Sequence, residues 1–112
     1  MKSTQKYPSL RQLQYFVAIA EHTSYRRAAE EVGVSQPALT AQITALEASL
    51  QVALFERSRS GTLVTPEGRE LLSHARQILM TMQEFMEQAE VIAHGNYSTY
   101  KLGVPPTLGP YL

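Results

Sequence analysis

The sequence predicts a mainly α-helical fold in which three helices and a two-stranded hairpin precede a long fourth helix. Three observations support this prediction. Apolar residues recur at three- and four-residue steps through residues 9–50, which is the period of amphipathic helices. Two short strand-like runs flank a cluster of turn residues within 52–65. No glycine or proline interrupts residues 69–94.

Composition places the chain among globular proteins. With 112 residues, 44% of them hydrophobic, it can form one small domain with an extension. The absence of cysteine excludes a disulfide framework and a thiolate metal site. No apolar run approaches the roughly 18 residues that a membrane span needs, and the first residues lack the apolar core of a signal peptide. We therefore expect a soluble, cytoplasmic protein with no membrane contact.

The charges are unevenly distributed although their sum is zero. Residues 1–66 contain seven basic and five acidic residues, whereas residues 67–112 contain three basic and five acidic ones. Proteins that bind nucleic acid usually carry a basic surplus, because lysine and arginine neutralise phosphates. Any DNA contact is therefore expected in the front part of the chain.

The first two predicted helices, residues 9–22 and 25–32, each follow a residue that can cap the first turn. The candidate caps are Ser9 for the first helix and Thr23 or Ser24 for the second. Gly33 follows the second helix and can take the left-handed conformation of a C-cap without a Cβ clash. The chain is therefore expected to turn sharply into a third helix.

The third predicted helix begins after Ser35 and has Pro37 in its first turn, where a missing N–H costs nothing. Its buried stripe is predicted to comprise Leu39, Ile43, Leu46 and Leu50. Small and polar residues form the opposite face: Gln36, Thr40, Ala41 and Thr44. Two short helices joined by a glycine turn fit a helix-turn-helix, whose second helix enters the major groove of DNA.

Periodicity alone fits a three-helix bundle with a merely solvated outer face equally well. A solvated face usually carries lysine and glutamate, yet this one carries no charge before Glu47. Gln36 could instead bond adenine, and Thr40 could bond a base or a phosphate. Pro37 and Ala38 could touch thymine methyl groups. The residue types thus favour base reading.

The rest of the chain is predicted to form a wing and a dimerising helix. A hairpin around Ser58, Arg59, Ser60 and Gly61 completes a winged helix-turn-helix domain at residues 1–65. Thr65-Pro66 opens a linker helix over 66–94. Its heptad pattern and a second stripe beside it predict a homodimer. The predicted dimer residues are Leu71, Leu72, Ala75, Ile78, Leu79, Met82, Phe85, Met86, Ala89 and Ile92.

Several motifs together resemble the LysR-type transcriptional regulators over residues 9–94. They are Ala28-Ala29, Val34-Ser35-Gln36-Pro37-Ala38, Leu46-Glu47, Leu54-Phe55-Glu56-Arg57 and Thr65-Pro66-Glu67-Gly68. The resemblance implies that Gln36, Pro37, Ala38 and Thr40 read the major groove, while Arg57 and the turn after it, Ser58 and Arg59, approach the minor groove. The chain departs from many members at Ala41, where they carry a basic residue. The tail and the HTSYRRAA segment resemble OxyR-like peroxide sensors.

Two groups of basic residues have an alternative interpretation. Ser24, Tyr25, Arg26 and Arg27 open the second helix, where N–H groups and guanidinium groups could hold a phosphate. One of the two arginines could equally pair with Glu30 or Glu31 along the helix. Arginine is also favoured in a narrow A·T-rich minor groove, but Arg57 could form an ion pair with Glu56 or Glu47 instead.

No residue pattern suggests an enzyme or a metal site. The sequence lacks a catalytic triad, a glycine-rich phosphate loop and a zinc motif, and we interpret His22, His74 and His94 as surface or helix-end residues. Residues 95–112 are expected to be a hinge and the truncated start of an effector-binding domain. We therefore expect no cofactor in this fragment, and a small-molecule effector in the missing C-terminal domain.

The predicted function is sequence-specific regulation of transcription. A two-fold dimer would bind an inverted-repeat promoter site. The resemblance implies tetramers for the full-length protein, and RNA polymerase is a further candidate partner. The alternative is a protein-interaction module with the winged helix as a passive scaffold, which the zero net charge favours.

Overall fold

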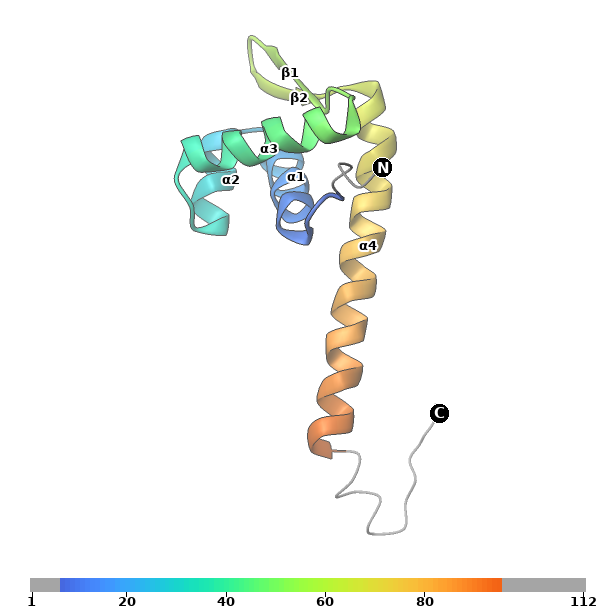
Figure 1. Ribbon diagram of the computed structural model, residues 1–112. Helices are drawn as coiled ribbons and strands as arrows, with labels where there is room; N and C mark the ends of the chain where they lie inside the picture. The colour runs from blue at the N-terminus through green and yellow to red at the C-terminus, as the bar shows by residue number, and fades with distance from the viewer. Residues whose placement is uncertain (1–6, 96–112) are drawn as a thin grey trace. The chain divides into compact units, whose positions relative to one another are not determined.

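The computed structural model describes residues 7–95. Figure 1 shows the order of its elements. These are α1 (Leu10–His22), α2 (Tyr25–Val32), α3 (Gln36–Leu50), β1 (Phe55–Ser58), β2 (Gly61–Val64), α4 (Pro66–Glu90) and the π-helix η1 (Val91–Gly95). The predicted fold class, three helices with a two-stranded wing and then a long helix, is confirmed.

Serine hydroxyls start the first three helices. Ser9, Ser24 and Ser35 each accept a hydrogen bond from the backbone N–H three residues later, which satisfies one of the free donors of a first turn. The sequence offered Thr23 or Ser24 as the N-cap of the second helix, and the structure shows that Ser24 is the cap. Thr23 instead ends α1 in the left-handed conformation, as Gly33 ends α2. These caps fix where the chain turns between the helices.

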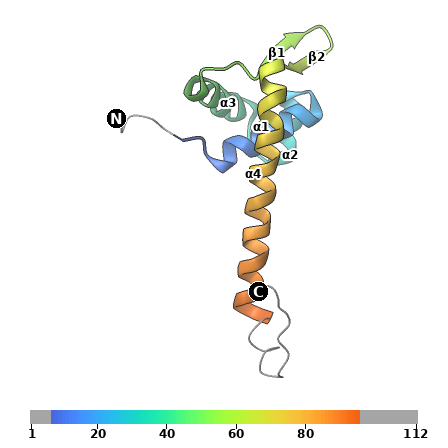
Figure 2. The same ribbon diagram turned by 90° about the vertical axis from the view of Figure 1, so that its right-hand side faces the viewer.

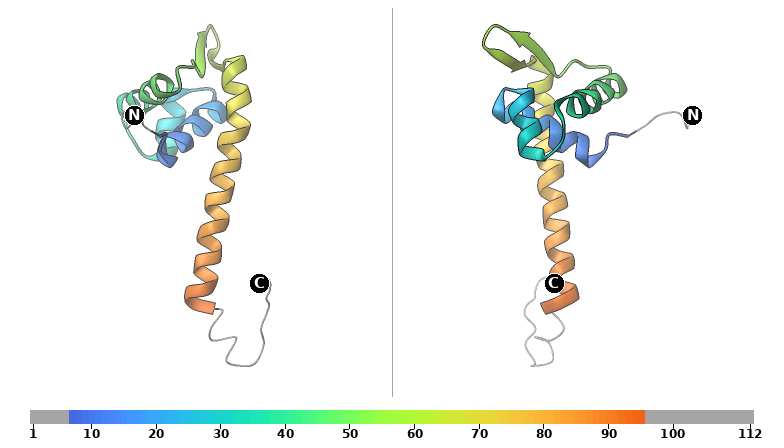
Figure 3. Two further views of the ribbon diagram at one scale, coloured as in Figure 1. Left: turned by 45° about the vertical axis from the view of Figure 1, so that its right-hand side comes forward. Right: turned by 90° about the vertical axis from the view of Figure 1, so that its left-hand side faces the viewer.

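The core lies among α1, α2 and α3, which pack as one group in both views of Figure 3. We call residues 10–64, from the start of α1 to the end of β2, the head. Its largest fully buried side chains are Phe16, Ile19, Leu39, Ile43, Leu46 and Leu54. Ala28 and Ala29 are also buried, which allows α2 to approach its neighbours closely. The apolar stripe predicted for the third helix is therefore correct, with Leu50 only half-buried.

The beginning of α4 completes this core. Leu72 is 9% exposed and Ala75 is 3% exposed, and both belong to the same buried cluster as the three helices. Arg76 also lies 3.6 Å from Glu21 of α1. The sequence assigned Leu72 and Ala75 to the dimer contact, but in the structure both side chains are buried in the chain's own core. Leu71 packs against that core as well, so the first three turns of α4 anchor the head.

The hairpin is shorter than its apolar pattern predicted. Phe55 pairs with Val64 and Ser58 with Gly61, so only Arg59 and Ser60 lie between the paired strands. Residues 52–54, which the sequence placed in the first strand, precede β1 instead. Leu54 is fully buried there, because it packs into the head core rather than pairing in the sheet. Figure 2 shows the hairpin beside the first turn of α4.

The link between α3, the hairpin and α4 is held by side chains that bond backbone. The Glu47 carboxylate accepts the N–H of Leu54 at 2.7 Å and that of Phe55 at 3.4 Å. The Thr65 hydroxyl donates to the carbonyl of Ala53 at 2.6 Å and accepts the N–H of Gly68 at 2.8 Å. Thr65 thus caps α4, as its position before Pro66 predicted, and also ties the helix to the segment before β1.

A second compact unit of the chain begins at Met80. Here α4 continues to Glu90, and η1 takes its place at Val91. The helix end predicted at His94 lies within η1, so the α-helix ends at Glu90 and the helical backbone continues to Gly95. The hinge and effector-domain start proposed for 95–112 lie outside the described residues except for Gly95. No helix among residues 7–95 is long and apolar enough to cross a membrane.

Replacing Glu47 tests whether this link stabilises the fold. Glu47→Ala leaves the N–H of the fully buried Leu54 without its partner, which typically costs about 1–3 kcal/mol. Glu56→Ala, an exposed change on β1, is the matched control and is expected to stay within about 0.5 kcal/mol of the parent. Urea unfolding measures both. Equal stabilities of the two variants would contradict this role of Glu47.

Candidate nucleic-acid interface

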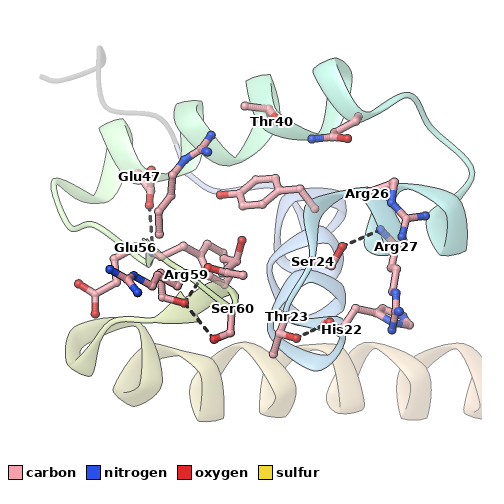
Figure 4. A pocket seen from close by; sticks show the side chains of 17 residues that line it. His22, Thr23, Ser24, Arg26, Arg27, Thr40, Glu47, Glu56, Arg59 and Ser60 are labelled. Atoms are coloured by element: carbon pink, nitrogen blue, oxygen red, sulfur yellow. Dashed lines mark hydrogen bonds between the residues drawn. The ribbon is translucent and has the colours of Figure 1, made fainter.

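An open hollow of about 740 Å³ lies within the head between the start of α2, one side of α3 and the hairpin. Figure 4 shows Arg26 and Arg27 on the α2 side, Arg59 and Ser60 on the hairpin side, and Thr40 on α3. Segments that are far apart in the sequence thus contribute basic and hydroxyl groups to one concave surface.

The α2 side of the hollow combines a helix start with guanidinium groups. Ser24 is occupied as the N-cap, because its hydroxyl accepts the N–H of Arg27 at 3.1 Å. Arg26 lies 3.2 Å from Glu30, so the helix ion pair that the sequence left open is formed by this arginine. No carboxylate among residues 7–95 lies within 4.0 Å of the Arg27 guanidinium. Arg27 is therefore free to bind an anion.

The hairpin side carries two further arginines. Arg57 and Arg59 are exposed, and neither forms an ion pair with a described residue. The alternative pairing of Arg57 with Glu47 or Glu56 is thus absent from the structure. The Glu47 carboxylate instead accepts hydrogen bonds from the N–H groups of Leu54 and Phe55. Ser58, the other wing residue singled out by the sequence, donates its hydroxyl to the Gly61 carbonyl at 3.0 Å and so stiffens the turn.

Helix α3 presents two neighbouring surfaces. Gln36 and Thr40 line the hollow, whereas the remaining predicted contact residues of this helix are exposed outside it: Ser35, Pro37, Ala38, Ala41 and Thr44. Ser35 is the N-cap, and its hydroxyl already accepts the N–H of Ala38 at 3.2 Å. The predicted charge-free face of α3 is therefore accessible along its length, and its contact with bases stays a prediction.

Tyr25 is a packing residue as well as a lining residue. Its ring makes an edge contact with Phe55, with centroids 5.9 Å apart, and Phe55 makes a similar contact with Phe16 at 5.5 Å. Burial raises the pKa of the Tyr25 phenol above its ordinary value. The nearby Glu47 carboxylate raises this pKa further, and Arg57 lowers it. Tyr25 thus connects α2 to the base of the wing.

The hollow includes residues that the sequence did not predict as DNA contacts. His22 and Thr23 contribute from the end of α1, and Phe55, Glu56 and Thr62 contribute from the hairpin. The sequence signal for His22 and Thr23 was a short connection between two predicted helices, which does not reveal that this corner meets the wing. Of the three histidines, His22 is half-buried and contacts Glu31, while His74 and His94 are exposed, as expected for surface or helix-end residues.

Comparison with known proteins identifies this arrangement. Residues 10–69, more than half of the chain, match the model of a bacterial regulatory helix-turn-helix protein of the lysR family. The chain belongs to the lysR family. A relative in Escherichia coli K12, the DNA-binding transcriptional dual regulator OxyR, is 40% identical over 104 residues, which cover 93% of this chain. The chain spans only 34% of that protein.

Solved lysR-family structures share the fold. The Corynebacterium glutamicum OxyR C206 mutant aligns with a TM-score of 0.78 at 39% identity, over 83% of this chain and 30% of that one. The DNA complex of the CbnR DNA-binding domain aligns with a TM-score of 0.71 at 41% identity, over 77% of this chain and 99% of that one. About three quarters of this lysR-family chain therefore corresponds to nearly the whole of a separately solved domain.

The described residues offer no arrangement typical of a metal centre, since no group of three or more His, Asp or Glu side chains among them could hold an ion. The hollow of this lysR-family head combines guanidinium, amide and hydroxyl groups with the carboxylates of Glu47 and Glu56. Guanidinium groups bind anions, and amide and hydroxyl groups can bond base edges.

The raised pKa of Tyr25 predicts an alkaline dependence of stability. Because the folded state holds the phenol proton more tightly than the unfolded state, this contribution is present below pH 10 and is lost as pH rises through the folded pKa. We expect Tyr25→Phe to lose less stability above pH 10 than the parent. Thermal unfolding between pH 8 and pH 11, with Tyr7→Phe as the exposed control, measures this difference. Parallel curves would contradict it.

Proposed function

We propose that this chain is the DNA-binding part of a lysR-type transcriptional regulator that inserts α3 into the major groove. The observation that carries the proposal is the combination of an exposed, charge-free α3 face with three arginines that lack ion pairs within the described residues: Arg27, Arg57 and Arg59. Exposed arginines usually pair with neighbouring carboxylates or repel one another, so a cluster around one hollow favours a polyanionic partner.

The three sides of the hollow suit different parts of a duplex. Gln36 and Thr40 have side chains suited to base edges in the major groove, where glutamine can bond adenine. Arg27 and the α2 start suit a phosphate, because N–H groups and a guanidinium converge there. Arg57 and Arg59 suit a phosphate or a narrow minor groove. The solved DNA complex of the related CbnR domain supports DNA as the partner of this fold.

The two parts of the chain are proposed to have separate roles. Residues 1–65 bind DNA, and residues 66–94 join two copies into a homodimer that binds an inverted repeat. Exposed apolar side chains on α4 and η1 support the dimer: Ile78, Phe85, Met86 and Ile92. Because Leu72 and Ala75 are buried in the head core, the proposed dimer surface starts near Ile78. Leu79, Met82 and Ala89 complete it.

The remaining proposals concern the whole protein. We place it in the cytoplasm at promoter DNA, acting as a regulator and not as an enzyme. We propose that a small-molecule effector binds a domain other than the head. Tetramer formation and contact with RNA polymerase would also involve parts of the protein other than the head. The similarity to OxyR favours a peroxide-related signal, which would be sensed outside the described residues. A passive winged-helix scaffold is the competing proposal, and it requires no specific DNA binding.

Binding to DNA and its dependence on Gln36 separate these two proposals. Fluorescence anisotropy on a fragment of the protein's own promoter, with a scrambled competitor and a salt titration, should show specific, steeply salt-dependent binding. Gln36→Ala is expected to reduce discrimination between the two DNAs by about 1–3 kcal/mol. Gln42→Ala is the matched control, because Gln42 is exposed on α3 but does not line the hollow. Binding indifferent to sequence would support the scaffold.

A charge in the proposed dimer surface tests the second role. Met82→Asp places a carboxylate in the apolar stripe of α4, so we expect it to separate the dimer and to weaken DNA binding sharply. Sedimentation and anisotropy on the same samples measure both effects. Gln83→Asp, one residue further along the helix, provides the control for the added charge. A Met82→Asp monomer that binds DNA as well as the parent would contradict the link.

A further inference from the structure

The corner between α1 and α2 contains a residue in an unusual conformation. Thr23 has φ +51° and ψ +34°, which is left-handed backbone. A β-branched side chain is disfavoured there, and such conformations persist only where the surroundings fix them. At the corresponding position after α2 the chain has Gly33, which adopts this backbone freely. Because threonine stands at the first corner, we expect a contact that holds its backbone in the left-handed conformation.

All polar groups of Thr23 are engaged. Its N–H donates to the carbonyl of Ile19 at 2.7 Å, and its hydroxyl donates to the carbonyl of His22 at 2.6 Å. Its own carbonyl accepts the N–H of Thr62 at 3.3 Å. Thr62 belongs to β2, so the carbonyl points from the end of α1 to the wing. The left-handed conformation is what directs this carbonyl outward.

The wing residue before Thr62 makes the approach possible. Gly61 has φ +133°, and a Cβ atom added to it would lie 3.1 Å from the carbonyl oxygen of Thr23. The corner and the wing thus lie close together at two successive wing residues, Gly61 and Thr62. A Cβ atom at position 61 would require the wing and the corner to shift apart by a few tenths of an ångström, because the atom that it meets belongs to the backbone.

The remaining contacts leave the wing little freedom. At its base the N–H of Thr65 donates to the carbonyl of Leu54 at 2.9 Å, and along its side Phe55 packs between Phe16 and Tyr25. At its turn Ser58 bonds the Gly61 carbonyl. The contact with Thr23 is the point of support nearest to the turn that carries Arg59.

We infer that Thr23 and Gly61 form a joint that docks the wing on the α1–α2 corner and so sets the spacing across the hollow between the wing arginines and Arg27. Both are positioning residues, which act on DNA through Arg57 and Arg59. The inference rests on the proposed function. A docked wing presents its arginines without first losing conformational freedom, which favours binding.

The experiment compares Gly61→Ala with Gly33→Ala. Both place a Cβ on backbone of positive φ, but the added atom meets nothing within 4 Å at Gly33. Gly61→Ala is expected to weaken binding and to lower the slope of log affinity against log salt by about 0.9 for each lost phosphate contact, up to about 1.8. Gly33→Ala is expected to keep the slope of the parent. Discrimination through Gln36 should persist in Gly61→Ala.

A mutant cycle shows whether the effect passes through the wing. In the Arg57→Ala, Arg59→Ala double variant, adding Gly61→Ala should change neither the affinity nor the slope, whereas a general loss of stability would add to the effect of the arginines. Hydrogen exchange of the Thr62 amide gives a readout that needs no DNA. We expect protection in the parent and in Gly33→Ala, and its loss in Gly61→Ala.

Three results would overturn the joint: an unprotected Thr62 amide in the parent, an unchanged salt slope in Gly61→Ala, or additive effects in the cycle. The failure of the proposed function looks different. In that case the parent shows no specific DNA binding at all, and the inferred action on DNA falls with it whatever the exchange of Thr62 shows.

Discussion

The fold depends on how the segment around Leu54 satisfies its backbone hydrogen bonds. This segment leads from α3 to the wing and buries Leu54 in the core, where an unpaired N–H or carbonyl is costly. Glu47 accepts its N–H groups, Thr65 bonds the carbonyls of Ala53 and Leu54, and Gly68 lets α4 pass so close that a Cβ would lie 2.4 Å from the Leu54 carbonyl oxygen. One crossing thus orients α3, the wing and the start of α4 together.

This crossing also explains why motif residues of the family divide into two kinds. Glu47, Thr65 and Gly68 belong to the strings that identify the family, yet each is occupied by the chain's own backbone. Gln36 and Arg57 belong to the same strings and are free of such contacts. Residues of the first kind hold the scaffold in which residues of the second kind face a common hollow, so identity of a motif does not by itself indicate contact with a ligand.

The hollow shows how rigid packing and free charge are combined in a small head. Tyr25 and Phe55 form an aromatic contact between α2 and the wing, and the corner at Thr23 contacts the wing nearer its turn. Arg27, Arg57 and Arg59 beside these contacts remain without carboxylate partners in the described part of the chain. A polyanion that enters such a surface meets charges whose positions are already set, which lowers the entropic cost of binding.

The sequence by itself determined the elements, because caps and hydrophobic periods are local: Ser9, Ser35, Gly33 and Thr65 act within one turn of the residues that they affect. It also indicated the charge-free face of α3. It could not determine that Leu72 and Ala75 belong to the head core, since a heptad pattern is the same whether its apolar stripe meets a second copy or the chain's own helices. Nor could it pair Thr23 with Thr62 or leave Arg57 unpaired. These results depend on which distant segments meet, and only tertiary packing decides that.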